Sequence, residues 1–295
     1  MQSAAVNEPS GSRPRAFGAA VLCCIAFAIN GCAASLLYPR LDSVVAYYLE
    51  DLVTLDEAQS QQLKRTLSAN LDWHRDSELR KYAQFLRGLS GSIEDRMDRE
   101  AWLQASRQTE DYWRAIFAQA APGYVAVAAT LTDQQVAELM RNLEKKDEET
   151  WSEFAERTPD ERRSRREKSL AKTLQRFTGP LTPAQRAMVE EYSARARPFM
   201  AEWRENRRIW RDALAAALAD RRSGESFAAR MTQLVARPDD LWTPQYRMAI
   251  DASRAALIEL LADLDATLTA KQRSAAQREL ASLADEVQGL ARARG

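Results

Sequence analysis

The sequence predicts an all-α protein, an elongated bundle of about eight or nine helices that follows an N-terminal signal peptide. Three observations support this class. Ala, Leu, Arg, Glu and Gln dominate the composition, while Gly and Pro are sparse at 10 residues each in 295, which is typical of helical proteins. Runs that alternate apolar and polar residues between turn signals, as strands do, are almost absent. Helix-start signals, in contrast, recur along the chain.

Charge and length narrow the possible classes of function. Lys plus Arg and Asp plus Glu both number 42, so the formal net charge is zero. A general nucleic-acid-binding protein would carry a basic excess, so nucleic acid is not an expected partner. The chain is long enough for one or two domains, and we expect a single helical domain over residues 41–295. The chain has one His, at position 74, and its three Cys all lie within the first 32 residues. We therefore expect neither a metal site nor a cofactor.

Residues 1–31 resemble a lipoprotein signal peptide. Arg13 and Arg15 precede an apolar run over residues 17–29, which is too short to span a bilayer but has the length of a signal sequence. The run leads into Ile29-Asn30-Gly31-Cys32, which resembles the lipobox at which bacterial lipoproteins are cleaved and acylated. The alternative is an ordinary secretory signal with an incidental Cys.

The lipobox resemblance has consequences for location. It implies a lipid such as palmitate on Cys32, a short tether over residues 32–40 and a membrane as the first partner. Ala33, rather than Asp, follows the Cys. By similarity to Gram-negative lipoproteins, this favours the outer membrane of the bacterial cell envelope, with the protein facing the periplasm. After Cys32, no stretch approaches the roughly 20 apolar residues that a membrane-spanning helix needs.

Helix starts can be located because capping residues precede most segments of helical periodicity. Asp42, Asp56 and Asp98 are the first three expected caps, and "SGS" at residues 90–92 is expected to end the helix that Asp56 opens. In order, the expected helices cover residues 43–53, 57–89, a segment from 99 toward Pro122-Gly123, one opened by Thr132, one from Pro159 to Thr178, one from Pro183 to Gly224, residues 226–236, one from Pro244 and one opened by Thr269.

One short motif marks several of these starts. Leu-Thr-x-x-Gln begins at Leu131, Leu181 and Leu268, and Leu55 opens a variant with Asp in place of Thr. Thr at the N-cap accepts a hydrogen bond from the third helical amide, and Gln at that position reaches back to the cap. The copies are unevenly spaced, which excludes a solenoid of fixed period. We interpret the motif as a device that starts helices rather than as evidence of activity.

The helix expected between Pro183 and Gly224 is the longest, near 40 residues or roughly 60 Å, with a kink at Pro198. Its apolar seam follows the three-four spacing of helix bundles. Asn206 interrupts the seam, either as a register-setting polar residue or as a ligand contact. The seam residues are Val189, Tyr192, Ala196, Phe199, Trp203, Asn206, Trp210 and Leu214.

Charge is segregated between two neighbouring segments. Residues 144–156 are mostly acidic, and residues 162–168 are strongly basic. If the junction between them folds the two into an antiparallel pair, they form an intramolecular ion-pair surface that adds little stability. The alternative is a site for an anionic lipid headgroup or an acidic partner, since clustered Arg suits phosphate. The candidate basic patch consists of Arg162, Arg163, Arg165 and Arg166.

The most unusual polar cluster surrounds His74, the one His of the chain. On a helical wheel, His74, Arg75 and Glu78 fall on the apolar face of the helix expected over residues 57–89, and their spacings let Glu78 meet both neighbours. Trp73 points elsewhere and could cover another helix. Polar groups on a core face need hydrogen-bond partners, so one interpretation is a buried structural network. The other is a site with a general base, although no matched nucleophile accompanies it.

Several segments resemble an uncharacterised family of helical proteobacterial lipoproteins. The resemblance covers nearly all of the chain after Cys32 and implies a helical fold and an envelope location, but no activity. A looser similarity, carried by the Leu-Thr-x-x-Gln copies alone, is to the periplasmic helical chaperones of envelope stress that share this motif. The most specific parts of the family resemblance are "RLD" at residues 40–42, "WHR" at residues 73–75 and Glu78-Leu79.

We therefore expect a lipid-anchored, non-enzymatic binding protein or chaperone-like scaffold in the periplasm, whose partner is an unidentified envelope protein or lipid. One alternative is a hydrolase or lipid-modifying enzyme that uses His74, Glu78 and Arg75. Another is a lipid carrier with an apolar groove between helices. A deep pocket at His74 would favour the enzyme, and a continuous apolar cavity would favour the carrier.

Overall fold

The computed structural model describes residues 38–293, and within this range the chain is helical with no strand. The expected all-α class is confirmed. The predicted signal peptide, Cys32 and most of the predicted tether lie outside the described residues. The elements are η1 (Tyr38–Arg40), α3 (Leu41–Glu50), α4 (Glu57–Trp73), η2 (His74–Glu78), α5 (Leu79–Glu94), α6 (Arg99–Ala128), α7 (Asp133–Ala155), α8 (Pro159–Thr178), α9 (Pro183–Arg195), α10 (Met200–Ala219), α11 (Glu225–Ala236), η3 (Pro238–Leu241), α12 (Pro244–Ala266) and α13 (Ala270–Arg292).

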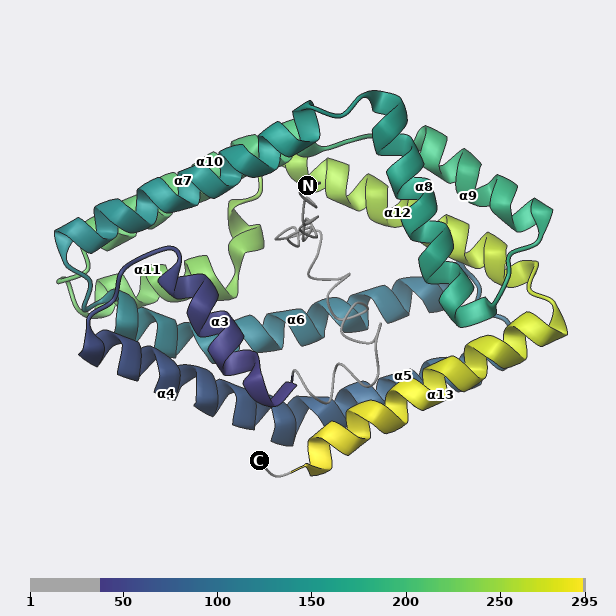
Figure 1. The fold of residues 1–295 in the computed structure, drawn as a ribbon, viewed down its shortest axis with the longest axis horizontal. Coiled ribbons are helices and arrows are strands. Elements are labelled where there is room, and N and C mark those ends of the chain that lie inside the picture. The colour runs from purple at the N-terminus through teal and green to yellow at the C-terminus, as the bar shows by residue number, and fades with distance from the viewer. Residues whose placement is uncertain (1–37, 294–295) are drawn as a thin grey trace, which may run out of the picture.

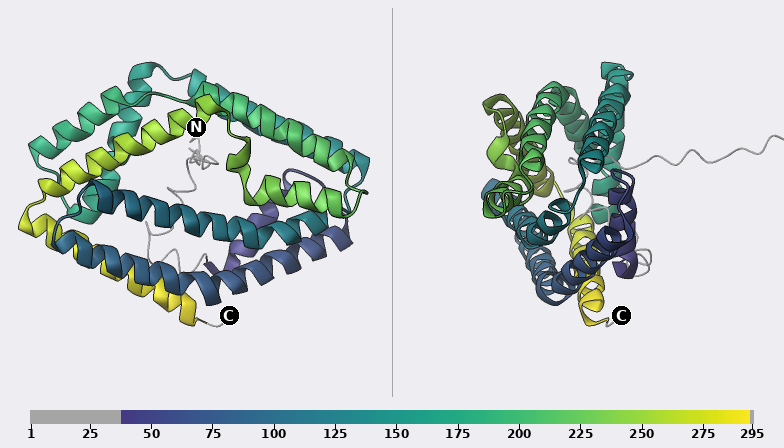
Figure 2. Two further views of the ribbon diagram at one scale, coloured as in Figure 1. Left: turned by 180° about the vertical axis from the view of Figure 1, so that it is seen from behind. Right: turned by 90° about the vertical axis from the view of Figure 1, so that its left-hand side faces the viewer.

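The helices form a flattened, elongated frame (Figure 1). Its lower side consists of α4 and α5, with α13 packed along α5, and its upper side consists of the pairs α7 with α10 and α9 with α12. Helix α6 runs inside the frame and contacts α4, α11 and α12. Two further views show that the frame is thin from front to back and that α3 lies on one of its broad faces (Figure 2).

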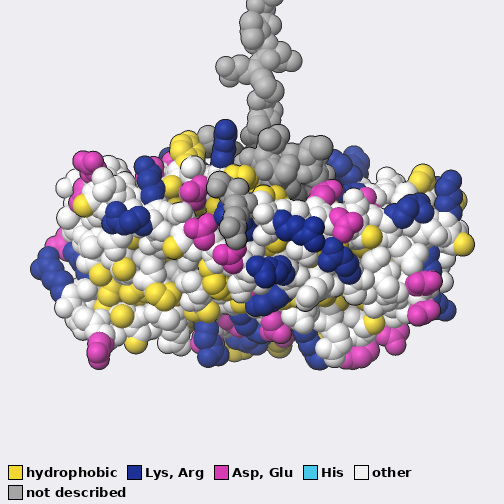
Figure 3. All heavy atoms as spheres, turned by 90° about the horizontal axis from the view of Figure 1, so that it is seen from below, with side chains coloured by type: hydrophobic (Ala, Val, Ile, Leu, Met, Phe, Trp, Pro, Cys, Tyr) yellow, Lys and Arg dark blue, Asp and Glu magenta, His cyan; other side chains and the backbone are white. Residues whose placement is uncertain are grey.

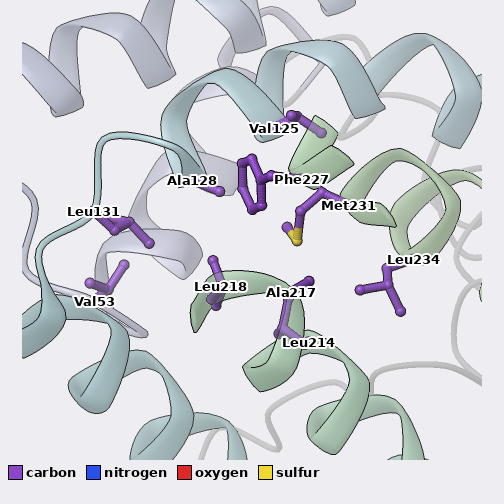
Figure 4. Packing of buried hydrophobic residues seen from close by; sticks show 10 residues of the cluster. All are labelled: Val53, Val125, Ala128, Leu131, Leu214, Ala217, Leu218, Phe227, Met231 and Leu234. Carbon is purple, nitrogen blue, oxygen red and sulfur yellow. The ribbon is translucent and has the colours of Figure 1, made fainter. Parts of the chain in front are cut away.

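The buried apolar residues are distributed over separate clusters rather than one central core. The largest joins α6, α10 and α11 with the loops beside α4 and α7 (Figure 4). A second lies between α3, α4 and α6, and a third lies between α5 and α13. Each cluster therefore stabilises one contact between helices. The residues of the largest cluster are Val53, Val125, Ala128, Leu131, Leu214, Ala217, Leu218, Phe227, Met231 and Leu234.

The three Leu-Thr-x-x-Gln copies open α7, α9 and α13, and the variant with Asp56 opens α4. In each, the cap side chain accepts a hydrogen bond from the third helical amide, and the Gln side chain accepts one from the amide of the cap residue. Before α9, Gly179 ends α8 with a φ of 73°, a conformation that glycine adopts without steric cost. The caps are Asp56, Thr132, Thr182 and Thr269.

The same glutamines also join the copies in pairs, which the sequence reasoning missed. Gln59 Nε2 donates to Thr130 O at 2.9 Å, and Gln135 Nε2 donates to Thr54 O at 2.8 Å. The two amides also bond each other, with N–O distances of 3.1 and 2.7 Å. We call this pair the first joint. It holds the N-termini of α4 and α7 together at one end of the frame (Figure 1).

The second joint repeats this geometry with Gln185 and Gln272. Their Nε2 atoms donate to Thr267 O at 3.2 Å and to Pro180 O at 2.9 Å, and the two amides bond each other at 3.0 and 2.8 Å. Gln185 is fully buried, at 0% exposure. This joint holds the N-termini of α9 and α13 at the opposite end of the frame (Figure 1).

Two expected helix ends were wrong. Residues 90–92 lie inside α5, where Ser90 Oγ donates to Gln277 O of α13 at 3.0 Å. Packing along α13 thus outweighs the low helix propensity of the Gly in this segment. Pro122 lies inside α6, which runs on to Ala128. There a Cβ on Gly123 would lie 2.1 Å from Thr66 Cγ2, so the Gly permits the close crossing of α4 and α6.

The expected 40-residue helix is also wrong, because the chain leaves helical geometry between α9 and α10. Ala196 is extended, with a ψ of 115°, and α10 begins at Met200. Pro198 lacks a backbone N–H and disfavours helix at the residue before it. Here it breaks the helix instead of kinking it. The longest described helix is α6, with 30 residues.

None of the helices described between residues 38 and 293 combines the length and the apolar character needed to cross a lipid bilayer.

We predict that Gln185→Ala and Gln272→Ala each lower the free energy of unfolding by about 2 kcal/mol, because each removes hydrogen bonds from the buried amide of the partner glutamine and from a backbone carbonyl. The double variant should lose clearly less than the sum of the two single losses, since both changes remove the same interaction. Urea denaturation followed by circular dichroism measures all three values.

The matched control is Gln134→Ala. Gln134 is exposed in the first turn of α7, beside a joint residue, so its replacement should change the free energy of unfolding by less than about 0.5 kcal/mol. Additive losses for Gln185→Ala and Gln272→Ala would contradict the joint.

Candidate functional site

The candidate polar site occupies a π-helical turn, η2, between α4 and α5. The turn is closed by a hydrogen bond from Leu79 N–H to His74 O, and its wider pitch inserts an extra residue relative to an α-helix. The faces on either side are therefore offset. Leu63 packs with α3 and α6, whereas Leu86 packs against the cluster of α5 and α13. The prediction of one continuous apolar face along residues 57–89 was therefore wrong, because the π-turn offsets α5 from α4.

His74 is tied to the first described residue of the chain. Tyr38 Oη lies 2.9 Å from His74 Nδ1, and the two rings stack with centroids 5.9 Å apart. Tyr82 meets the imidazole edge-on at 5.4 Å. Burial lowers the pKa of His74 from its usual 6.5 to about 4, although the carboxylate of Glu78 acts in the opposite direction. The imidazole is therefore neutral at physiological pH.

Arg75 and Glu78 do not pair, contrary to the i,i+3 expectation. Arg75 points back to Asp72, at 3.0 Å, and lies 5.8 Å from the centre of the Tyr38 ring. Glu78 points forward, where its Oε1 accepts from Ser77 Oγ and from Lys81 Nζ at 2.6 Å. The π-turn explains this separation, because the i,i+3 and i,i+4 rules hold only for α-helical pitch.

Glu78 is the most buried member of the cluster, at 1% exposure. Its Oε2 has no hydrogen-bond partner among residues 38–293. Burial, together with the charge of Glu78, raises the pKa of nearby Tyr112 above its usual value. Tyr112 lies against Tyr82, with ring centres 4.7 Å apart. Glu78 therefore lies beside the aromatic group around His74, with Lys81 as its ion-pair partner.

Trp73 ends α4 and is half-buried. Among the described residues, the ring contacts of His74 are with Tyr38 and Tyr82, so Trp73 lies outside this aromatic group. Tyr38 was missed as a site residue because the sequence placed it in the tether. Its ring is buried and η1 is ordered, and no spacing rule connects residue 38 with residue 74.

The arrangement supports structure better than catalysis. The imidazole already has a partner at Nδ1, and a pKa near 4 makes it a weak base at neutral pH. A surface hollow lies between α8 and α9, and none of the four candidate site residues lines it. Within residues 38–293, no group of three or more His, Cys, Asp and Glu side chains is arranged to hold a metal ion.

The acidic and basic runs do not face each other as expected. In the acidic run, Asp147 accepts from Arg207 at 2.9 Å and also pairs with Arg211, and Glu148 pairs with Arg204 at 2.7 Å. All three arginines belong to α10, which packs along α7. Asp147 and Glu148 therefore pair with the arginines of α10 rather than with the basic run of the adjacent α8.

The basic patch is divided between structural and exposed residues. Arg162 donates to the carbonyls of Phe154 and Arg157 at the end of α7, and its guanidinium lies 4.4 Å from the centre of the Phe154 ring. Arg166 donates to Ser193 O of α9 at 2.7 Å. Arg163 lies 3.6 Å from Asp160, and Arg165 is exposed. These four side chains are thus not gathered into one site.

Asn206 has a structural partner. It is buried in α10, and its Oδ1 accepts from Thr243 N–H at 3.0 Å, the residue that caps α12. The amide in the apolar seam therefore fixes the start of α12 against α10. This geometry agrees with the structural interpretation of Asn206.

The pKa of His74 predicts a pH effect on stability. The unfolded state binds a proton near pH 6.5 and the folded state only near pH 4, so between these values the unfolded state binds more protons. Stability should therefore fall as the pH is lowered through this window, by up to about 1.4 kcal/mol per pH unit from this group alone. Urea denaturation of wild type and His74→Gln from pH 7 to pH 4 measures the difference.

Tyr38→Phe is the matched control, because it removes the hydroxyl but keeps the buried imidazole. It should lower stability by about 1 kcal/mol and retain the pH dependence of the wild type. If His74→Gln and wild type lose stability in parallel across this range, the buried neutral imidazole is ruled out.

Comparison with known proteins places the chain in a family without adding an activity. No curated protein and no solved structure matches it. Residues 51–247 match a protein family described as "Family of unknown function (DUF6279)", which is more than half of the 295-residue chain. The matched region contains the π-turn and the first joint, whereas α3 and α13 lie outside it. The chain therefore belongs to the Family of unknown function (DUF6279).

Proposed function

We propose that the protein is a lipid-anchored, non-enzymatic binding scaffold of the bacterial cell envelope. The attachment point is Cys32, within the lipobox-like Ile29-Asn30-Gly31-Cys32. The family resemblance to proteobacterial lipoproteins supports the same location, at the outer membrane and facing the periplasm. Its binding partner is an envelope protein or a lipid.

The observation that carries the proposal is the contact between His74 and Tyr38. The strongest candidate for a catalytic base instead fixes the first described residue of the chain to the π-turn, through a 2.9 Å hydrogen bond and a stacked ring. Tyr38 follows the proposed lipid attachment site by six positions (38 minus 32). In this role the polar cluster holds the chain, six positions after the anchor, against the α4–α5 side of the frame.

The alternatives have less support. A hydrolase would need a base with a pKa near the working pH, whereas that of His74 is about 4. A lipid carrier would need one continuous apolar cavity, whereas the buried apolar residues form separate clusters. The Leu-Thr-x-x-Gln motif gives no client-binding surface, because its glutamines are engaged in the joints. A chaperone-like activity would therefore use other surfaces.

If Cys32 carries the lipid, the wild-type chain should incorporate labelled palmitate in a Gram-negative host. Cys32→Ser should abolish this labelling. The matched control is Cys23→Ser, which changes a Cys within the predicted signal peptide and should leave labelling intact. The measurement is labelling followed by immunoprecipitation. Incorporation that persists in Cys32→Ser would contradict acylation at this site.

The scaffold predicts a defined envelope partner. A photo-crosslinking amino acid at Arg165, which is exposed on α8, should capture one or a few envelope proteins or lipids in cells, identified by mass spectrometry. The same amino acid at Leu218, which is fully buried, measures the background capture by a probe that cannot reach a partner. Equal capture spectra at the two positions would contradict a binding role for this surface.

A further inference from the structure

Helix α3 exposes two adjacent tyrosines. Tyr47 and Tyr48 are 69% and 49% exposed, and their rings meet edge to face with centroids 6.2 Å apart. The opposite side of α3 is well packed, since Ala46 is buried against Leu63 of α4 and Val127 of α6. The tyrosines therefore project from a helix whose orientation is fixed. Tyrosine is enriched at interfaces, because it combines an apolar ring with a polar hydroxyl.

The position of α3 in the chain limits what can reach this surface. Six positions separate Cys32 from Tyr38, so even a fully extended link spans at most about 20 Å. Tyr38 is itself fixed on His74, and α3 begins three residues later, at Leu41. At about 3.6 residues per turn, the tyrosines lie only about two helical turns beyond that point. A lipid on Cys32 would keep α3 near the bilayer surface.

The shape of the molecule is compatible with this contact. Helix α3 lies on a broad face of the frame rather than within it, and in the side view it forms part of the outline (Figure 2). A bilayer that met α3 would therefore face the broad side of the molecule. Where α4, α5 and α13 form the lower side of the frame, Lys and Arg side chains are interspersed with Asp and Glu, without segregation of one sign (Figure 3).

We infer that Tyr47 and Tyr48 insert at the headgroup level of the membrane that holds the lipid anchor. Tyrosine suits this depth, because its ring is apolar and its hydroxyl can remain hydrated. Helix α3 carries Asp42 and Glu50 and no Lys or Arg, so the contact is with a zwitterionic phospholipid surface rather than with anionic lipid. This inference rests on the proposed acylation of Cys32, which supplies the attachment.

The test uses the full acylated protein in phosphatidylcholine vesicles. After removal of the signal peptide, Cys32 is the one Cys of the chain and its thiol is acylated, so a single new Cys can be labelled selectively. A fluorophore on Glu50→Cys lies within one helical turn of both tyrosines. A fluorophore on Met248→Cys is the control. Met248 is 64% exposed and belongs to α12, far along the chain from the anchor. Lipids with a nitroxide on the headgroup quench a fluorophore at the surface.

We expect quenching at position 50 to be severalfold stronger than at position 248. Tyr47→Ser with Tyr48→Ser should reduce it to the level at position 248, while the protein still floats with the vesicles. Equal quenching at positions 50 and 248 in a floating wild-type protein overturns the membrane contact alone. Weak quenching at position 50 that falls further as the protein density on the vesicles rises would indicate that a second copy of the protein covers α3. This result would also overturn the membrane contact. Failure of the wild type to float overturns the anchor and the contact together.

Discussion

The architecture depends on a reciprocal hydrogen-bonded pair of glutamines, used twice. In each joint, both amide oxygens accept from their own helix cap and from the partner amide, and both nitrogens donate to the partner amide and to a partner carbonyl. Every polar atom of the two amides is thus bonded in a partly or fully buried setting, where an unmade bond would be costly. Separate apolar clusters stabilise local contacts between helices, and one joint at each end of the frame fixes the N-termini of two helices against each other.

The π-turn plays a different part, at the lower side of the frame. The turn joins two helices that pack against different neighbours. Helix α4 packs against α3 and α6, whereas α5 packs against α13. The polar residues that the turn collects serve the fold: His74 holds Tyr38, Arg75 holds Asp72, and Glu78 holds Lys81. In the sequence these residues resemble a catalytic cluster, whereas in the structure His74 holds the start of the described chain at Tyr38. This is why the proposed function is binding at an anchored surface rather than chemistry.

Local features of the fold could be predicted from the sequence, and tertiary ones could not. The capping boxes and the all-α class follow from residue types at short spacing, and the structure has both. Several errors arose where a distant partner decided the outcome. Residues 90–92 stay helical because α13 packs there, and Asp147 pairs with α10 rather than with the adjacent basic run. Gln59 and Gln135 were recognised as capping residues, but no local rule reveals which two copies meet.

The central claim is that each glutamine holds its partner helix as well as its own. Hydrogen exchange measured by mass spectrometry on Gln185→Ala tests it most directly, because the start of α13 is 87 residues away in the sequence. We expect faster amide exchange at the starts of both α9 and α13, with the starts of α4 and α7 unchanged. Faster exchange confined to the start of α9 would show that the glutamine acts only as a local cap and would contradict the account.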